Sequence, residues 1–107
     1  MIIDRDTPKA GEVYRHFKGY HYKIIAVGHH SETKEQLVVY YDLSGKNSTL
    51  NNPCIRPLEM FMSEVDHDKY PDVKQKYRFE RFEEWLFYYA FYLFLQSFQI
   101  LLVWYFI

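Results

Sequence analysis

The sequence has a single cysteine, Cys54, so no disulfide can form within the chain. Its 13 basic and 14 acidic residues nearly cancel, to a net charge of −1, so no global field draws the chain to nucleic acid or to an anionic membrane. Nothing that resembles a signal peptide precedes Asp4, Arg5 and Asp6, and we therefore expect a cytoplasmic protein. A length of 107 residues leaves room for one small domain.

Charge is also absent from the end of the chain. Residues 85–107 contain no Lys, Arg, Asp, Glu or His, although all earlier parts are rich in them. This contrast predicts a division into a flexible lead-in at 1–10, a folded domain at 11–80 and a hydrophobic helix at 81–107.

The folded part contains short stretches rich in β-branched and aromatic residues, separated by turn-forming residues. These stretches predict strands at Glu12–Phe17, Tyr20–Val27, Gln36–Leu43 and Pro53–Arg56. Residues 77–80 are either a closing strand or the start of the terminal helix. Pro57 suits the first turn of a helix, and apolar residues recur after it at helical spacing. We therefore expect a mainly β protein, a small SH3-like barrel with a short helix after Pro57.

The stretch His30-Ser31-Glu32-Thr33 lies in a polar loop between two predicted strands. Because the loop has no apolar residue and joins two apolar strands, it is the first candidate for a functional segment.

Several motifs together resemble the bacterial family catalogued as domain of unknown function 1653. They are Tyr14-Arg15-His16-Phe17-Lys18-Gly19, His30-Ser31-Glu32-Thr33, Val38-Val39-Tyr40, Arg56-Pro57-Leu58 and Met60-Phe61. The resemblance covers about Gly11 to Val65. It implies a small SH3-type barrel, and it implies no reaction.

The chain departs from that family's usual pattern at several positions. It has His29 in place of an Arg, Cys54-Ile55 in place of Trp-Val, and Tyr77 in place of a Pro ahead of Arg78-Phe79-Glu80. If the missing Trp lines a binding surface, this chain binds its ligand weakly.

Two arginines next to apolar strand residues need partners, since burying an unpaired guanidinium is costly. In one interpretation Arg15 and Arg56 pair with carboxylates, for which Glu32, Glu35 and Glu59 are candidates. In the other they form a shallow site for an anionic or peptide ligand. Its predicted residues are Arg15, His16, His30, Ser31, Glu32, Thr33 and Arg56.

Our first hypothesis is therefore a binding module without catalytic residues, metal or cofactor, whose partner is a peptide, a protein or a small anion. The alternative is a metal-dependent or hydrolytic enzyme that uses His29 and His30, although these residues lack a recognised ligand or triad spacing. A single-stranded nucleic-acid binder is a further alternative, because basic residues interleave with aromatic ones over 14–23. The neutral total charge disfavours it.

The uncharged tail from Trp85 to Ile107 allows three interpretations. As a helix it would reach about 35 Å and could cross a membrane, and the basic residues before it would keep the barrel on the cytoplasmic side of the inner membrane. It could instead pack on the barrel or on a second copy. In the third interpretation the tail is the product of a frame shift in an AT-rich gene, which would encode similar residues, and it has no selected function.

Overall fold

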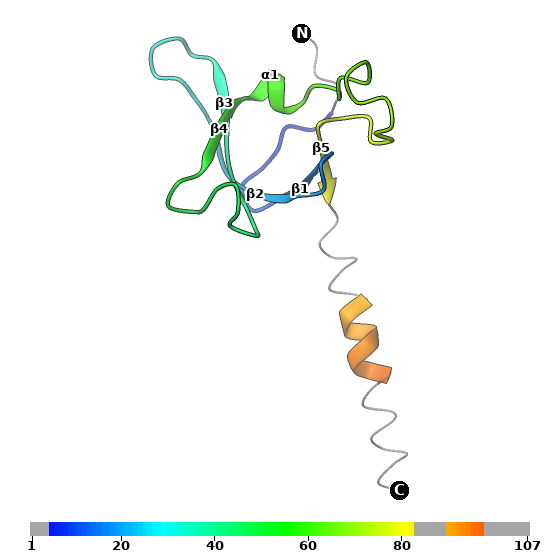
Figure 1. Cartoon of the computed structure of the whole chain (residues 1–107). Coiled ribbons are helices and arrows are strands. Elements are labelled where there is room, and N and C mark those ends of the chain that lie inside the picture. The colour runs from blue at the N-terminus through cyan, green and yellow to red at the C-terminus, as the bar shows by residue number, and fades with distance from the viewer. Residues whose placement is uncertain (1–4, 83–89, 98–107) are drawn as a thin grey trace, which may run out of the picture.

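The computed structural model describes residues 5–82 and 90–97 and shows a curled antiparallel sheet (Figure 1). Its elements are β1 (Val13–His16), β2 (His21–His29), β3 (Gln36–Asp42), β4 (Cys54–Pro57), α1 (Leu58–Phe61) and β5 (Phe79–Phe82). The five strands are arranged in the order β4-β3-β2-β1-β5. The prediction of a mainly β, barrel-like fold with a short helix after Pro57 is confirmed. Of residues 77–80, the last two belong to the closing strand β5 and not to a helix.

Tight turns and a bulge give the sheet its shape. Gly19 closes the β1–β2 hairpin with φ of 101°, a conformation that L side chains rarely adopt. Between β2 and β3 the register shifts from Ile24 to Ala26, so one residue of β2 is left over. Such a bulge increases twist and bends the strand, which helps the sheet to curl around its inner face.

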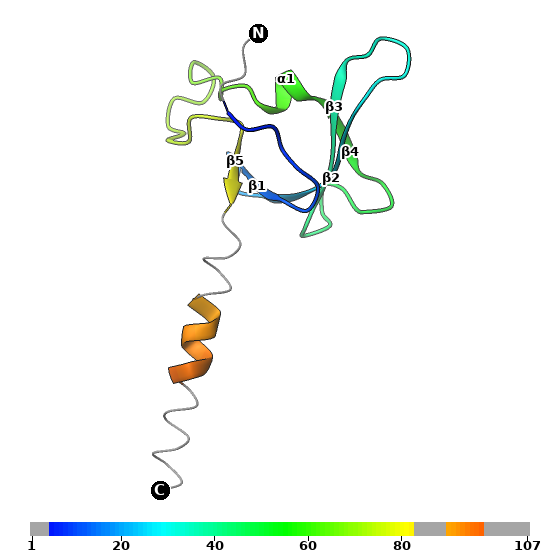
Figure 2. The same cartoon turned by 180° about the vertical axis from the view of Figure 1, so that it is seen from behind.

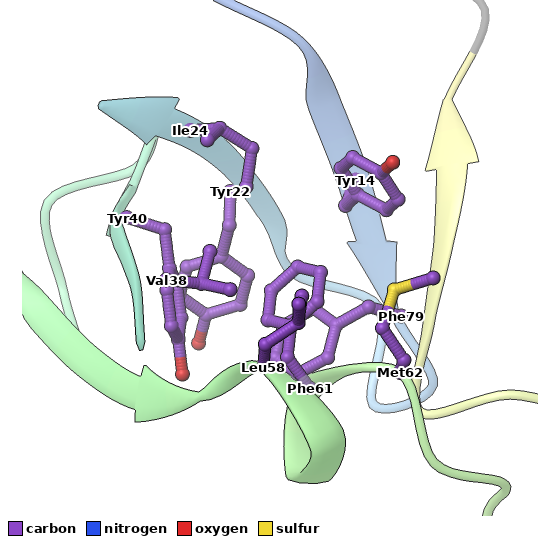
Figure 3. Close-up of a cluster of buried hydrophobic side chains, with 9 residues drawn as sticks. All are labelled: Tyr14, Tyr22, Ile24, Val38, Tyr40, Leu58, Phe61, Met62 and Phe79. Carbon is purple, nitrogen blue, oxygen red and sulfur yellow. The ribbon is translucent and has the colours of Figure 1, made fainter. Parts of the chain in front are cut away.

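The inner face of the curled sheet holds an aromatic core (Figure 3). Phe61 of α1 and Phe79 of β5 are almost fully buried, and their rings stack with centroids 4.1 Å apart. Tyr14 and Tyr40 each pack edge-on against Phe61 at 5.3 Å. Aromatic pairs in such geometries contribute about 0.5–1.5 kcal/mol each beyond the area that they bury. The helix α1 therefore covers the hollow of the sheet and supplies part of its apolar filling.

The lead-in expected at 1–10 contacts the barrel over its described part. Arg5 donates hydrogen bonds to the backbone carbonyls of Met62 (2.9 Å) and Phe79 (3.1 Å). Pro8 is buried, and the backbone N–H of Gly11 donates to Ile24. This segment crosses one side of the barrel between α1 and β2, as Figure 2 shows from behind.

The hydrophobic helix predicted over 81–107 does not include residues 81 and 82, because β5 continues to Phe82. Of the expected helix, residues 90–97 are described and are helical, whereas 83–89 and 98–107 lie outside the described residues. Five consecutive large apolar side chains of this helix, from Phe91 to Leu95, are exposed. Within the described residues, no helix has the length and apolar character that a membrane crossing needs.

Candidate ligand-binding site

The loop His30 to Thr33 folds around the His30 ring. Its Nδ1 atom accepts hydrogen bonds from the backbone N–H groups of Glu32 (3.1 Å) and Thr33 (3.2 Å). The Thr33 hydroxyl oxygen in turn accepts the N–H of Glu35 at 3.3 Å. These side chains stabilise the turn between β2 and β3 by satisfying backbone donors, as short polar residues commonly do in loops.

Arg15 lies far from this loop. It pairs with His21 at the first residue of β2, whereas the loop follows His29 at the last residue of that strand. At about 3.4 Å per residue, the two ends of the strand are separated by roughly 27 Å. The Arg15 side chain is exposed and lines a wide depression of about 580 Å³ together with Lys74 and Glu80. The structure therefore does not bring Arg15 and the loop together.

The carboxylate partners expected for the two arginines are not found in the described residues. The ion pairs there join Arg81 to Glu12 at 3.2 Å and Lys76 to Glu64 at 3.8 Å. The predicted pairing of Arg15 and Arg56 with Glu32, Glu35 or Glu59 is therefore wrong for this structure.

His16 and Arg56 converge on one ring, that of Phe79. The His16 ring lies 4.8 Å from the Phe79 ring, centroid to centroid, in a T-shaped arrangement. The guanidinium carbon of Arg56 lies 5.6 Å from the Phe79 centroid. Strands β1, β4 and β5 each supply one of these residues, so the curl of the sheet creates the arrangement. Arg15, one residue before His16 on β1, points to the opposite face because side chains alternate along a strand.

Two tyrosines complete this end of the core. The Tyr22 and Tyr40 rings lie 5.4 to 5.7 Å from Phe79, and Figure 3 shows their hydroxyl groups pointing the same way. The Tyr22 hydroxyl accepts a hydrogen bond from the Asn47 side chain at 3.4 Å. Burial raises the pKa of both hydroxyls, and for Tyr40 the charge of Arg56 offsets part of this rise. Both phenols are therefore uncharged at neutral pH.

His16 is neutral because of where it lies. Burial lowers its pKa to about 4, assisted by the positive charges of Arg56, Lys18 and Arg78. Its Nδ1 atom accepts the backbone N–H of Lys18 at 3.1 Å, so the ring proton of the neutral form is on Nε2. His16 thus offers Nε2–H as a hydrogen-bond donor, because the Lys18 amide is bonded to Nδ1.

Two buried arginine nitrogens near His16 lack a hydrogen-bond partner in the described part of the chain. They are Nη1 of Arg56 and Nε of Arg78. A buried donor without a partner costs about 1–3 kcal/mol, and more when the group is charged. We define the Arg56 cluster as His16, Tyr22, Tyr40, Arg56 and Phe79, which pack around the Phe79 ring, together with Arg78, whose positive charge acts on His16.

A cavity of about 150 Å³ differs from the Arg56 cluster in this respect. It lies between the lead-in segment and the barrel, where Arg5 and Arg81 line it. Arg5 already donates to two backbone carbonyls, and Arg81 pairs with Glu12. Its two arginines are therefore engaged within the protein.

The structure also describes the residues on which the metal, hydrolase and nucleic-acid alternatives depend. Among residues 5–82 and 90–97, no group of three or more His, Cys, Asp or Glu side chains is arranged to hold a metal ion. His30 Nδ1 is occupied by backbone N–H groups rather than by a hydroxyl. Tyr14 and Tyr22, two aromatic residues of the expected nucleic-acid surface, are buried in the core.

Sequence reasoning selected His16 and Arg56 but missed Tyr22, Tyr40, Arg78 and Phe79. Alternation along a strand does not show where a tyrosine hydroxyl ends, so the positions of Tyr22 and Tyr40 did not point to a site. Arg78 and Phe79 stand in the Arg-Phe-Glu stretch, which pointed to the family and not to a site. Three separated stretches, around His16, Arg56 and Arg78, therefore meet at one place.

Comparison with known proteins adds a family. The family model described as "Protein of unknown function (DUF1653)" matches residues 12–84. The match extends beyond Val65, where the motifs end, and includes all strands of the barrel. No curated protein and no solved structure matches the chain. The chain therefore belongs to the DUF1653 family of proteins of unknown function.

Proposed function

We propose that the protein is a binding module, not an enzyme, and that its ligand contacts the Arg56 cluster. The observation that carries the proposal is the buried Nη1 atom of Arg56, which has no partner in the described residues. Because such an atom is costly to bury, a ligand group that accepts its hydrogen bond would recover free energy on binding.

The chemistry of the cluster favours binding over catalysis. The raised pKa values of Tyr22 and Tyr40 make these hydroxyls poor nucleophiles at neutral pH. Burial and, to a smaller extent, the cationic neighbours of His16 disfavour its protonated form, which a general base must reach during proton transfer. The groups can donate hydrogen bonds and fix an orientation, which is what recognition needs.

The surface predicted from the sequence is an alternative binding site, located elsewhere on the barrel. It would use Arg15 and the His30 to Thr33 loop in addition to His16 and Arg56. Since Arg15 and the loop lie at opposite ends of β2, variants at these positions can separate the two surfaces.

The test is an NMR screen of the isotopically labelled full chain against a fragment library with neutral, cationic and anionic members. We expect some members to shift the amide signals of residues 16, 22, 40 and 79, and expect Arg56→Gln to abolish these shifts. Arg15→Gln should leave them in place, as should Lys46→Gln, a change at an exposed turn residue. If no fragment shifts the cluster, or if the shifts centre on residues 30–35, the proposal fails.

We also propose that the tail attaches the barrel to a membrane or to another apolar surface. Five consecutive exposed apolar side chains in the helix 90–97 support this, as do the uncharged residues around it. Lys74, Lys76 and Arg78 precede the tail, so the barrel would lie on the cytoplasmic side.

Flotation of the full chain with phosphatidylcholine vesicles tests the attachment. We expect the wild-type chain to float with the vesicles and the double variant Leu93→Lys/Phe94→Lys to stay at the bottom of the gradient. Lys46→Gln serves as the control. A wild-type chain that stays unbound would refute membrane attachment. Sedimentation analysis would then show whether the chain self-associates, and a monomer would refute attachment to any apolar surface.

A further inference from the structure

We infer that the ligand group bound by the Arg56 cluster is an oxyanion, a carboxylate or a phosphoryl group. This inference rests on the proposed function and specifies the ligand's chemistry. It requires that the cluster offer hydrogen-bond donors and positive charge, and that no acidic side chain of the protein already satisfies them.

The donors come from two arginines. Nη1 of Arg56 and Nε of Arg78 are buried and without partners in the described chain. A guanidinium group has only donors, and its planar fork matches the oxygen atoms of carboxylate and phosphate. An uncharged carbonyl ligand would satisfy one donor but would leave two positive charges uncompensated in a half-buried place.

The neighbouring groups reinforce this preference. Neutral His16 holds its proton on Nε2 and can donate it. Burial is the main cause of its low pKa, and the positive charges of Arg56, Lys18 and Arg78 lower it further. The Tyr40 phenol stays protonated and can donate a hydrogen bond as well. Donors and positive charge on one side of a site select against a cationic ligand and favour an anion.

Two acidic side chains beside the cluster are already engaged: Asp42, whose charge acts on Tyr22, and Glu80, which follows Phe79 in the chain. The Asp42 carboxylate accepts hydrogen bonds from Ser44 N (2.9 Å), Ser44 Oγ (2.8 Å) and Asn47 N (3.1 Å). One oxygen of Glu80 accepts the backbone N–H groups of Lys76 and Tyr77, both at 3.2 Å. Neither carboxylate is bonded to Arg56 or Arg78, so the positive charge of the cluster is left for an external anion.

The experiment titrates the full chain with inorganic phosphate, with acetate and with chloride at constant ionic strength. NMR signals of the arginine side chains and of the His16 ring report on binding. We expect phosphate or acetate to shift the Nε–H signal of Arg78 with saturation, and chloride to have no saturable effect. A bound anion opposes the repulsion by the nearby cations, so the pKa of His16 should rise from about 4.

Variants identify the groups responsible. Arg56→Gln and Arg78→Gln should each weaken anion binding by roughly tenfold or more, because each removes a charged hydrogen bond. Arg56→Lys keeps the charge without the planar fork and should give an intermediate affinity, and Lys46→Gln should have no effect. If Arg56→Gln does not fold, Arg78→Gln and the rise in the pKa of His16 decide the question in folded protein.

The outcomes distinguish the inference of an oxyanion ligand from the proposed function as a binding module. Binding of phosphate alone identifies a phosphoryl ligand, binding of acetate alone identifies a carboxylate, and binding of both supports the oxyanion class. The inference is overturned if chloride matches the other anions, if Arg56→Gln binds anions as tightly as the wild type, or if only neutral fragments shift the cluster. In that last case the proposed function survives, whereas a cluster that no fragment and no anion perturbs refutes both.

Discussion

The guanidinium carbon of Arg5 lies 3.6 Å from the centroid of the Tyr77 ring, so a residue near the start of the chain is stacked on the segment that leads into the last strand. The same guanidinium group donates to the carbonyls of Met62 and Phe79. Arg5 thus links three segments that are distant in the sequence. The contact joins the lead-in segment, the end of α1 and the beginning of β5.

Removal of this link should destabilise the barrel. We expect Arg5→Ala to lower the free energy of unfolding by about 1–3 kcal/mol, because two partly buried carbonyls lose a charged donor. Arg5→Lys should lose less, since it keeps the charge over the Tyr77 ring but not the two-pronged donation. Urea denaturation of both variants measures the effect, with Lys46→Ala as a surface control. A free energy for Arg5→Ala equal to that of the control would show that the lead-in does not stabilise the barrel.

The loop between β2 and β3 should depend on His30 and not on His29. His30→Ala leaves the N–H groups of Glu32 and Thr33 without their acceptor, at a cost of about 0.5–2 kcal/mol for comparable capping contacts. We expect faster hydrogen exchange at these two amides and a small change in global stability. His30→Asn should restore part of the protection, and His29→Ala should match the wild type. Equal exchange rates in His30→Ala and the wild type would contradict the proposed role of the ring.

The turn after β3 should depend on the charge of Asp42. Burial raises the pKa of Asp42, but hydrogen bonds from Ser44 and Asn47 outweigh it and lower the pKa below the usual 3.8. A folded-state pKa below the unfolded value stabilises the fold above the unfolded pKa, and the contribution is lost as pH falls through the folded pKa. Asp42→Asn should therefore lower the free energy of unfolding by about 1.5–3 kcal/mol at pH 7.

The pH dependence provides the check on Asp42. The stability gap between Asp42→Asn and the wild type should be constant from pH 7 down to about pH 4 and should narrow below that. Denaturant titrations at pH 7, 4 and 2.5 measure the gap. A gap that keeps its full size at pH 2.5 would mean that hydrogen-bond geometry, rather than the carboxylate charge, holds the turn.

His16 is a second group whose pKa is lower in the fold than in the unfolded chain, and unlike Asp42 it is a base. Its pKa falls from 6.5 in the unfolded chain to about 4 in the fold, so between these values the unfolded state binds more protons. The contribution of His16 to the free energy of unfolding is therefore fully present above pH 6.5 and decreases as pH falls toward 4. Below that, His16 causes no further change. His16→Gln should flatten this part of the pH profile, whereas His67→Gln should not. A His16 ring signal that titrates near 6.5 in the absence of ligand would contradict the neutral, cation-surrounded histidine.

The elements of the barrel were predictable because their signals are local. Alternation in β1 to β3, glycine at the hairpin turn and Pro57 before α1 each act within a few residues, and the family motifs lie in the same stretches. The limits of β5 were less predictable, because Arg81 and Phe82 join the sheet through pairing with Tyr14 and Val13 of β1. The loop His30 to Thr33 was identified as a unit, although its hydrogen bonds could not be read from its composition.

The sequence by itself determined that this chain forms a small β barrel of the DUF1653 family and that its last part carries no charge. Only the tertiary structure decided that His16, Arg56 and Phe79 meet while Arg15 does not. The reason is geometric, because β1 and β4 are not neighbours in the sheet and only its curl brings their inner faces to one ring. The direction of each side chain on a strand then separates Arg15 from His16, although they are adjacent in the chain.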